Sequence, residues 1–275
     1  MSSNISLKLY NLIKTGFIKS NAHFWKEYYN ENIINTYPCD LQEVKQELEE
    51  KGISVISIFD DNFPIADGKV KNSEKPFFFA YKGDISLLID IDKNIAVIGV
   101  LTPTNEIVER EQKVVKNLTK KSFNIVSGLA KGCDTVAHIE SVKNNAKTIA
   151  FLPSTIDKIY PKENIGLANE IINNGGLVVS EYINEPKDRY ERVKRFIERD
   201  RLQALYSKAV ILIASFRKGE GDSGSRHAFE KAKKYGKKRL AMFRETDVNN
   251  LIFGLNKDYV MQGEKVVSQK EIEAL

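Results

Sequence analysis

Residues 126–138, VSGLAKGCDTVAH, bring together several residue types that can do chemistry. Two glycines and a lysine precede an Asp, a Thr and a His. Glycine lets a backbone approach a ligand closely, and free N–H groups at the start of a helix attract anions. We therefore interpret residues 127–131 as an anion-binding turn, and we expect Asp134 to be the N-cap of the following helix.

The same stretch matches no catalytic or nucleotide-binding motif. It is neither G-x-G-x-x-G nor a P-loop, and Ile125 stands where the first glycine of a G-x-S-x-G elbow around Ser127 would be. Asp134 and His138, four positions apart, would share a helix face, where we expect them to pack or to hydrogen-bond. No cluster of His, Cys and acidic residues has the spacing of metal ligands. The sequence thus predicts no catalytic residue, no metal and no cofactor.

A second glycine-serine loop, GEGDSGS at residues 219–225, stands directly before Arg226. Its hydroxyl and N–H groups suit phosphate oxygens, and Arg226 would add a charge-assisted hydrogen bond. The alternative interpretation is a flexible surface loop.

Positive charge is concentrated in two segments. The chain has 42 Lys and Arg against 37 Asp and Glu, a net charge of +5, which by itself only permits an anionic partner. Residues 187–201 and 231–239 are rich in cations, and the alternative interpretation of each is a solvated helix face. Within the first segment we expect Arg199 near the start of a helix, with Arg195 and Arg201 close by. These arginines would neutralise phosphates or pair with neighbouring carboxylates.

The 275 residues show no apolar run of membrane-spanning length and no export signal, and Cys39 and Cys133 form no disulfide framework. We therefore expect a soluble, cytoplasmic protein. From residue 94 onward, short apolar runs alternate with amphipathic segments, which predicts an α/β fold: an extended Rossmann-like parallel sheet with helices on both faces. Strands are expected at 53–59, 77–81, 95–98, 125–126, 148–152, 177–179, 209–213 and 240–243.

A small helical region is expected at residues 1–50, before a Rossmann-like domain at 51–275. Ligands of open parallel sheets bind outside the carboxyl ends of the strands. Both glycine loops and the first basic segment are expected at that edge.

Several segments resemble the DprA/Smf family of DNA-processing proteins in order and spacing. They are SGLAKGCDTVAH, TIAFLPSTIDKIYPKEN (148–164) and GGLVVSEY (175–182). RFIERDRLQALYSKAVILI (195–213) is similar to the F-x-x-R-N-R segment of that family, and GDSGSRHAFEKAKKYGK (221–237) to its S-G-S loop. The resemblance spans roughly residues 51–275.

The resemblance implies a non-enzymatic protein that binds single-stranded DNA, forms a homodimer and loads the RecA recombinase during natural transformation. The contacts it implies are Ser127, Gly128, Lys131, Arg199, Arg201, Ser223, Gly224 and Ser225, supported by Lys162 and Asn164. The residues themselves add Arg195 and Arg226 to the expected phosphate-binding set. Aromatic side chains that would stack on bases near this edge are Tyr160, Tyr182, Tyr190, Phe196 and Phe216.

The chain departs from the family pattern at functional positions. The usual V-G-S-R is replaced by IGVL at residues 98–101, so a phosphate-binding arginine is missing, and R-N-R reads RDR, with Asp200 in the middle. The winged-helix domain that many members carry has no counterpart in these residues. We therefore expect a divergent member. The alternatives are a sensor that binds or hydrolyses a nucleotide or nucleotide-derived signal, as in a phage-defence or mobile-element system, and an interaction module of such a system.

Overall fold

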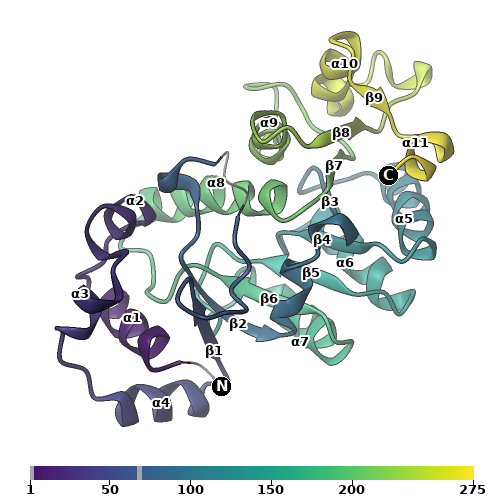
Figure 1. The fold of residues 1–275 in the computed structure, drawn as a ribbon. Coiled ribbons are helices and arrows are strands. Elements are labelled where there is room, and N and C mark those ends of the chain that lie inside the picture. The colour runs from purple at the N-terminus through teal and green to yellow at the C-terminus, as the bar shows by residue number, and fades with distance from the viewer. Residues whose placement is uncertain (1–2, 67–69) are drawn as a thin grey trace.

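The computed structural model describes residues 3–66 and 70–275, which form one mixed sheet of nine strands with helices on both faces (Figure 1). The strand order is β1-β2-β6-β5-β4-β3-β7-β8-β9. The strands are β1 (Ser54–Ser57), β2 (Phe78–Gly83), β3 (Asn94–Ile98), β4 (Asn124–Ser127), β5 (Thr148–Phe151), β6 (Leu177–Ser180), β7 (Ala209–Leu212), β8 (Lys238–Ala241) and β9 (Lys265–Val266).

The seven strands from β6 to β9 pair in parallel, whereas β2 pairs antiparallel with both β6 and β1. The predicted α/β class is confirmed, and all eight predicted strands are present. The short strand β9 was not predicted, because two residues carry no readable alternation. From β3, the next strands of the chain are added on one side (β4, β5 and β6), and the later strands are added on the other side (β7, β8 and β9). The place beside β3 where the direction changes is a topological switch point, and open α/β sheets bind ligands at such points.

Helices cover the two faces of the sheet separately. One face packs on α8 and α9, and the other packs on α5, α6 and α7. Strands β3, β5, β6 and β7 are buried along their whole length, which is why they read as continuous apolar runs. The helices after β3 are α5 (Asn105–Lys120), α6 (Cys133–Lys143), α7 (Ile165–Asn173), α8 (Arg189–Leu205), α9 (Arg226–Lys234), α10 (Gly254–Met261) and α11 (Gln269–Glu273).

The N-terminal region is helical, as predicted. Its helices are α1 (Asn4–Lys14), α2 (Asn21–His23), a π-helical turn η1 (Phe24–Tyr28), α3 (Glu31–Asn35) and α4 (Leu41–Glu50). Leu9 and Val44 belong to the same apolar cluster as Phe78 of β2 and Val178 of β6. The hydroxyls of Ser6 and Ser57 also form a hydrogen bond, at 2.6 Å. These helices therefore share a core with the antiparallel end of the sheet.

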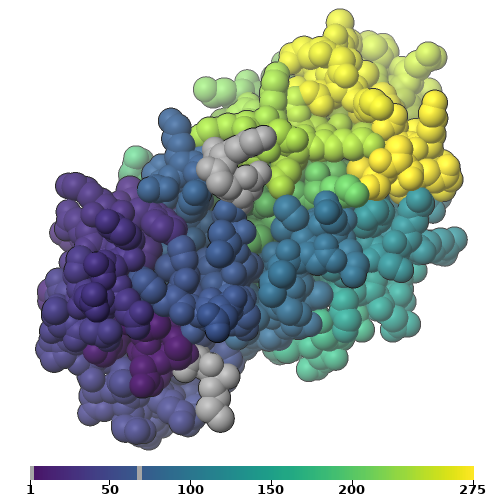
Figure 2. All heavy atoms as spheres, viewed as in Figure 1, coloured from purple at the N-terminus to yellow at the C-terminus, as the bar shows by residue number. Residues whose placement is uncertain are grey.

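In the described part of the chain, six 3-10 turns complete the fold, and the molecule is elongated. The N-terminal helices (purple) lie at one end and the C-terminal segments (yellow) at the other (Figure 2). The turns are η2 (Asn72–Glu74), η3 (Ile85–Leu88), η4 (Ile91–Lys93), η5 (Lys162–Asn164), η6 (Glu245–Asp247) and η7 (Leu251–Phe253). Within the described residues, no helix combines the length and the apolar character needed to cross a membrane.

Candidate nucleic-acid interface

A cavity of about 380 Å³ opens at the carboxyl edge of the sheet, beside the ends of β3 and β4. Its volume lies in the range of ligand-binding pockets. The two glycine loops, the loop after β3 and the middle of α8 all contribute to it. It is lined by Ile98, Gly99, Leu101, Gly128, Ala130, Lys131, Asp134, Tyr160, Pro161, Phe196, Arg199, Asp200, Gln203, Asp222, Gly224 and Ser225.

The first glycine loop is held against β3 from behind. Ser127, the last residue of β4, is buried and donates from its hydroxyl to the Val97 carbonyl at 2.7 Å. Gly132 has a φ of 75° and lies so close to the carbonyl oxygen of Val100 that a side chain would overlap it. This turn lets the Cys133 amide donate to that same carbonyl at 3.0 Å and start α6.

Asp134 does not cap α6, so that prediction is wrong. The N-cap position is Gly132, and Asp134 lies in the first helical turn. Its Oδ2 accepts instead from the backbone amides of Gly128 and Ala130, at 3.1 and 3.3 Å. Burial raises the pKa of Asp134, although the Arg199 charge opposes this shift. We expected the backbone amides of this loop to bind an anion, but two of them already donate to the Asp134 carboxylate.

Arg199 lies in the middle of α8, so the expectation that it stands near a helix start is wrong. The helix begins ten residues earlier, at Arg189, because the Asp188 side chain accepts from the Glu191 amide at 2.7 Å. Arg199 is 3% exposed, and its Nη1 donates to the Phe151 carbonyl at the end of β5 (2.9 Å). Its guanidinium fills the space where a side chain on Gly128 would be.

Asp200 brings a carboxylate into this cavity. Its Oδ1 lies 3.1 Å from Nε of Arg199, and its side chain is 13% exposed. Burial raises the pKa of Asp200 to about 7; the Arg199 charge opposes the shift, and the carboxylates of Asp134 and Asp222 reinforce it. The net charge of the cavity therefore changes near neutral pH.

The second glycine loop is tied to the loop after β3 through Asp222. The Oδ2 of Asp222 accepts from the Leu101 amide at 2.6 Å, and its Oδ1 accepts from the Gly224 amide at 3.2 Å. Ser225 follows at the cavity wall, and its buried hydroxyl has no hydrogen-bond partner among the described residues. The loop is thus anchored at one end and offers a free hydroxyl at the other.

The structure gathers five of the expected binding residues around the cavity: Gly128, Lys131, Arg199, Gly224 and Ser225. Ser127 lies behind the loop. Ser223 and Arg226 bond to each other beside the cavity, with Nη1 of the arginine 3.0 Å from the serine hydroxyl. Lys162 is exposed in η5.

Asn164 and two of the arginines make contacts within the fold instead. Asn164 donates to the Leu129 carbonyl at 2.8 Å and so supports the first loop. Arg195 donates to the carboxylate of Glu191 at 2.7 Å, and its guanidinium lies 4.4 Å from the centre of the Tyr182 ring. Arg201 donates to the carboxylate of Glu181 at 2.6 Å. Neither arginine lines the cavity.

The second basic segment is used within the fold. Lys231 and Lys234 of α9 both pair with Glu74, at 2.5 and 2.8 Å. Arg239 pairs with Glu264. These cations neutralise acidic side chains elsewhere on the surface and do not line the cavity.

Sequence reasoning missed Gln203 and Asp222 as cavity residues. Gln203 is 2% exposed and lines the cavity, and its side chain makes no hydrogen bond to any residue that the structure describes. Phe196, Arg199 and Gln203 are three and four residues apart and so lie on the same face of α8. This spacing could have indicated that Gln203 lies beside Arg199 at the cavity. Asp222 offered no signal, because its partner, Leu101, lies 121 residues away.

His138 is buried behind the first loop and does not contact Asp134 through a hydrogen bond. The Thr148 hydroxyl gives its single proton to the Ile125 carbonyl at 2.8 Å. The Nδ1 of His138, 2.7 Å from that hydroxyl, must therefore be the donor in their hydrogen bond. Burial, followed by the Arg199 charge, lowers the pKa of His138 to about 3, so the ring is neutral in the folded protein.

This burial predicts loss of stability in acid. The unfolded chain takes up a proton at His138 below pH 6.5 and the folded chain does not, so stability falls as the pH drops towards 3. Between pH 6.5 and 5 the loss is about 2 kcal/mol. Urea denaturation of wild type and His138→Gln at both pH values isolates this contribution from that of Asp200, which has the opposite sign. Equal pH dependence of the two proteins would contradict the assignment.

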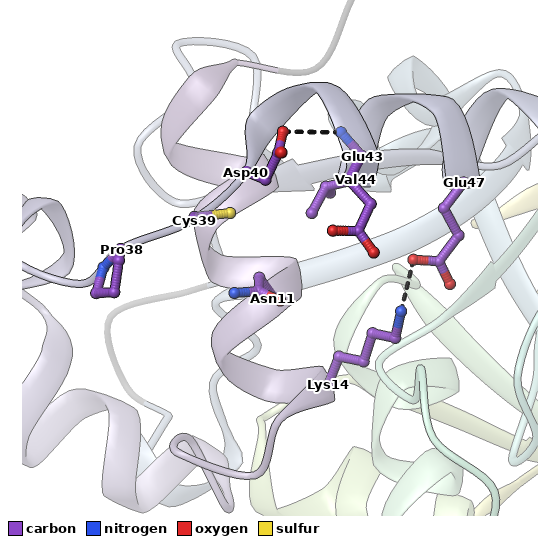
Figure 3. Close-up of a pocket in the computed structure, with 8 residues that line it drawn as sticks. All are labelled: Asn11, Lys14, Pro38, Cys39, Asp40, Glu43, Val44 and Glu47. Carbon is purple, nitrogen blue, oxygen red and sulfur yellow. Dashed lines mark hydrogen bonds and ion pairs between the residues drawn. The ribbon is translucent and has the colours of Figure 1, made fainter.

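A second hollow, of about 240 Å³, lies between α1 and α4 (Figure 3). Lys14 reaches across it to Glu47 at 2.7 Å, and Asp40 accepts from the Glu43 amide at the start of α4. The Lys14–Glu47 pair thus joins the two helices, whereas the Asp40 contact caps α4 itself. Among the residues that the structure describes, no group of His, Cys, Asp and Glu is arranged to hold a metal ion, here or at the larger cavity.

Comparison with known proteins relates the chain to DNA-processing proteins. It is 37% identical over 126 residues to DNA processing protein DprA of Streptococcus pneumoniae, which covers 46% of this chain and 43% of that protein. It is 28% identical over 194 residues to DprA of Bacillus subtilis, covering 70% and 62%. Protein Smf of Borreliella burgdorferi is 32% identical over 142 residues, covering 50% and 43%. The matched segments thus cover between about two fifths and two thirds of the length of these relatives.

Solved structures agree over a longer range. The crystal structure of S. pneumoniae DprA superposes with a TM-score of 0.77 at 25% identity, covering 100% of this chain and 98% of the other. The Helicobacter pylori DprA structure, described as revealing a single-stranded DNA binding mode, gives a TM-score of 0.66 at 26% identity, covering 81% and 94%. Residues 36–272 match the family DNA recombination-mediator protein A, and the chain belongs to that family.

Proposed function

We propose that this protein binds single-stranded DNA at the cavity on the carboxyl edge of the sheet and acts as a DNA-processing mediator. The observation that carries the proposal is the convergence of both glycine loops and Arg199 on one cavity at the switch point of the sheet. Its fold is similar to that of H. pylori DprA, whose structure is described as binding single-stranded DNA. Homodimer formation, loading of a RecA recombinase, a cytoplasmic location and the absence of turnover belong to the same proposal.

One part of the cavity suits a base and another part suits a phosphate. Leu101, Tyr160 and Phe196 supply apolar and aromatic walls, on which a base can stack. Lys131 at the rim pairs with Glu163 at 2.7 Å, with both side chains more than half exposed. An exposed pair of this kind contributes little to stability because solvent screens it, so Lys131 can exchange its partner for a phosphate at little cost.

Salt dependence tests the proposal. If about four phosphates are neutralised, the logarithm of the association constant falls with the logarithm of salt at a slope of about −3. Affinity then drops about fiftyfold between 50 and 200 mM salt. A fluorescent oligonucleotide titrated in single- and double-stranded form, with the double substitution of Lys131 and Arg199 to Ala as control, measures this. A flat salt response or equal affinity for duplex would contradict the proposal.

One observation favours a second candidate, a small nucleotide ligand. Three carboxylates, those of Asp134, Asp200 and Asp222, line the cavity, and Leu101 stands where the family has an arginine. This balance of charge suits a small ligand better than a long polyanion. Mass spectrometry of the denatured protein for a co-purified nucleotide, together with nucleotide competitors in the DNA titration, distinguishes the two candidates.

A further inference from the structure

The first half of α8 presents an exposed apolar ridge to solvent. Tyr190, Val193 and Ile197 are 79%, 51% and 40% exposed. Residues three and four positions apart lie on the same side of a helix, so the three side chains form one continuous row. The opposite side of α8 is buried in the core of the fold through Leu202 and Leu205. The ridge is therefore a surface that folding does not require.

Uncompensated positive charge borders this ridge. Arg189 and Arg192 are exposed. The acidic side chains nearby are used within the fold. Asp188 accepts from the amide that starts the helix, and Glu191 pairs with Arg195 at 2.7 Å.

Glu198, a third acid near the ridge, is paired with a cation, as Glu191 is. Glu198 accepts from the Tyr182 hydroxyl at 3.0 Å and lies 3.4 Å from the ammonium group of Lys194. The surface around Tyr190 is consequently positive as well as apolar.

The ridge continues directly from the cavity. Phe196 lines the cavity and contacts Tyr160, with 5.7 Å between the ring centres, and Tyr160 is 47% exposed. From Phe196 back to Arg189 the helix extends about 10 Å along its axis. A chain that emerged from the cavity past these two rings would meet Val193 first and Tyr190 next.

We propose that this outer face of α8, formed by Arg189, Tyr190, Arg192, Val193 and Ile197, is the track along which single-stranded DNA leaves the cavity. A base stacks on the Tyr190 ring, and the two arginines neutralise the adjoining phosphates. Single strands are bound by this combination of aromatic platforms and cations. The inference rests on the proposed function, because it extends the same binding site.

The chemistry of the ridge favours DNA over a protein partner. Three apolar side chains make a smaller patch than the roughly 800 Å² per partner of a stable protein interface. Arg189 and Arg192 stand four residues before Val193 and Phe196, so cations and apolar side chains alternate along this side of the helix, as charge and stacking surface alternate along a nucleic-acid strand.

Oligonucleotide length provides the test. A dinucleotide is short enough to be held at the cavity alone, whereas a 20-mer also reaches the ridge. The double substitution of Tyr190 and Arg192 to Ala is expected to weaken binding of the 20-mer five- to tenfold or more, since one stacked base contributes about 1–3 kcal/mol. Binding of the dinucleotide should change less than twofold. Both side chains are exposed, so the variant should fold as the wild type does.

Two controls make the result specific. Tyr190→Phe keeps the ring and should keep the affinity for the 20-mer. Tyr29→Ala removes another exposed tyrosine, 61% exposed, from the N-terminal region and should not change the affinity for either oligonucleotide. Unchanged binding of the 20-mer by the double variant, or equal losses for both lengths, would overturn the track while leaving the cavity as the DNA site. Failure of the wild type to bind either oligonucleotide would overturn both proposals.

Discussion

Gly128→Ala is expected to weaken binding of single-stranded DNA at least tenfold and to destabilise the protein by about 1–3 kcal/mol, the usual cost of overfilling a packed core. A methyl group at this position would overlap Nη1 of Arg199 and come within 2.5 Å of Nε2 of Gln203. The Arg199 side chain is buried and hydrogen-bonded to the Phe151 carbonyl, so it cannot easily adopt another rotamer. The added methyl must therefore displace the guanidinium from the cavity wall.

The measurement is a fluorescence titration at fixed salt together with urea denaturation. Gly166→Ala in α7 is the matched control, because no other atom lies within 4 Å of its added methyl group. That control should bind DNA normally and gain slightly in stability, since alanine favours helices. Normal DNA binding by a folded Gly128→Ala protein would contradict the placement of Arg199 at the binding site.

Arg201→Ala is expected to cost about 3–5 kcal/mol of stability, the usual consequence of breaking a buried ion pair on one side. Arg201 is 5% exposed and binds three groups within the fold. Its Nε donates to the Glu74 carbonyl at 2.9 Å and its Nη1 to the Glu198 carbonyl at 2.6 Å. Its Nη2 donates to Glu181 at 2.6 Å, and that carboxylate is left buried without its charge partner in the variant.

DNA binding separates this structural role from a direct contact. The resemblance to DprA proteins implies a DNA contact for Arg201, whereas its three internal hydrogen bonds favour a structural role. We expect the fraction of Arg201→Ala that stays folded to bind single strands with unchanged affinity and salt slope. Lys113→Ala, which removes an exposed cation from α5, should leave both stability and binding unchanged. A reduced salt slope for folded Arg201→Ala would show a phosphate contact instead.

Much of the fold could be predicted from local patterns. Runs such as residues 95–98 and 209–213 are apolar throughout because both faces of a parallel sheet are covered, and the helices between them carry one apolar side. The strand β9 escaped prediction because it has two residues and is placed by pairing with β8. The start of α8 at Arg189 was also missed, although Asp188 is a good capping residue.

The candidate site was predicted only in outline. The two glycine loops were identified from their residue types and their position after strands, and five of the expected residues do surround one cavity. The partners of the charged groups could not be predicted. Asp134 turned to the amides of the loop before it, and Gln203 reached the cavity because α8 crosses the edge of the sheet there.

By itself, the sequence determined the alternation of strands and helices, the two glycine loops and the surplus of cations, because these depend on residue type and on short-range spacing. Only the tertiary structure decided which cations reach the cavity. Arg199, Arg201 and Arg195 stand within seven residues on one helix, and all three bind acceptors within the fold, yet Arg199 alone among these three lines the cavity. Each side chain points in the direction set by its helical angle, and what it meets there is supplied by segments far away in the chain.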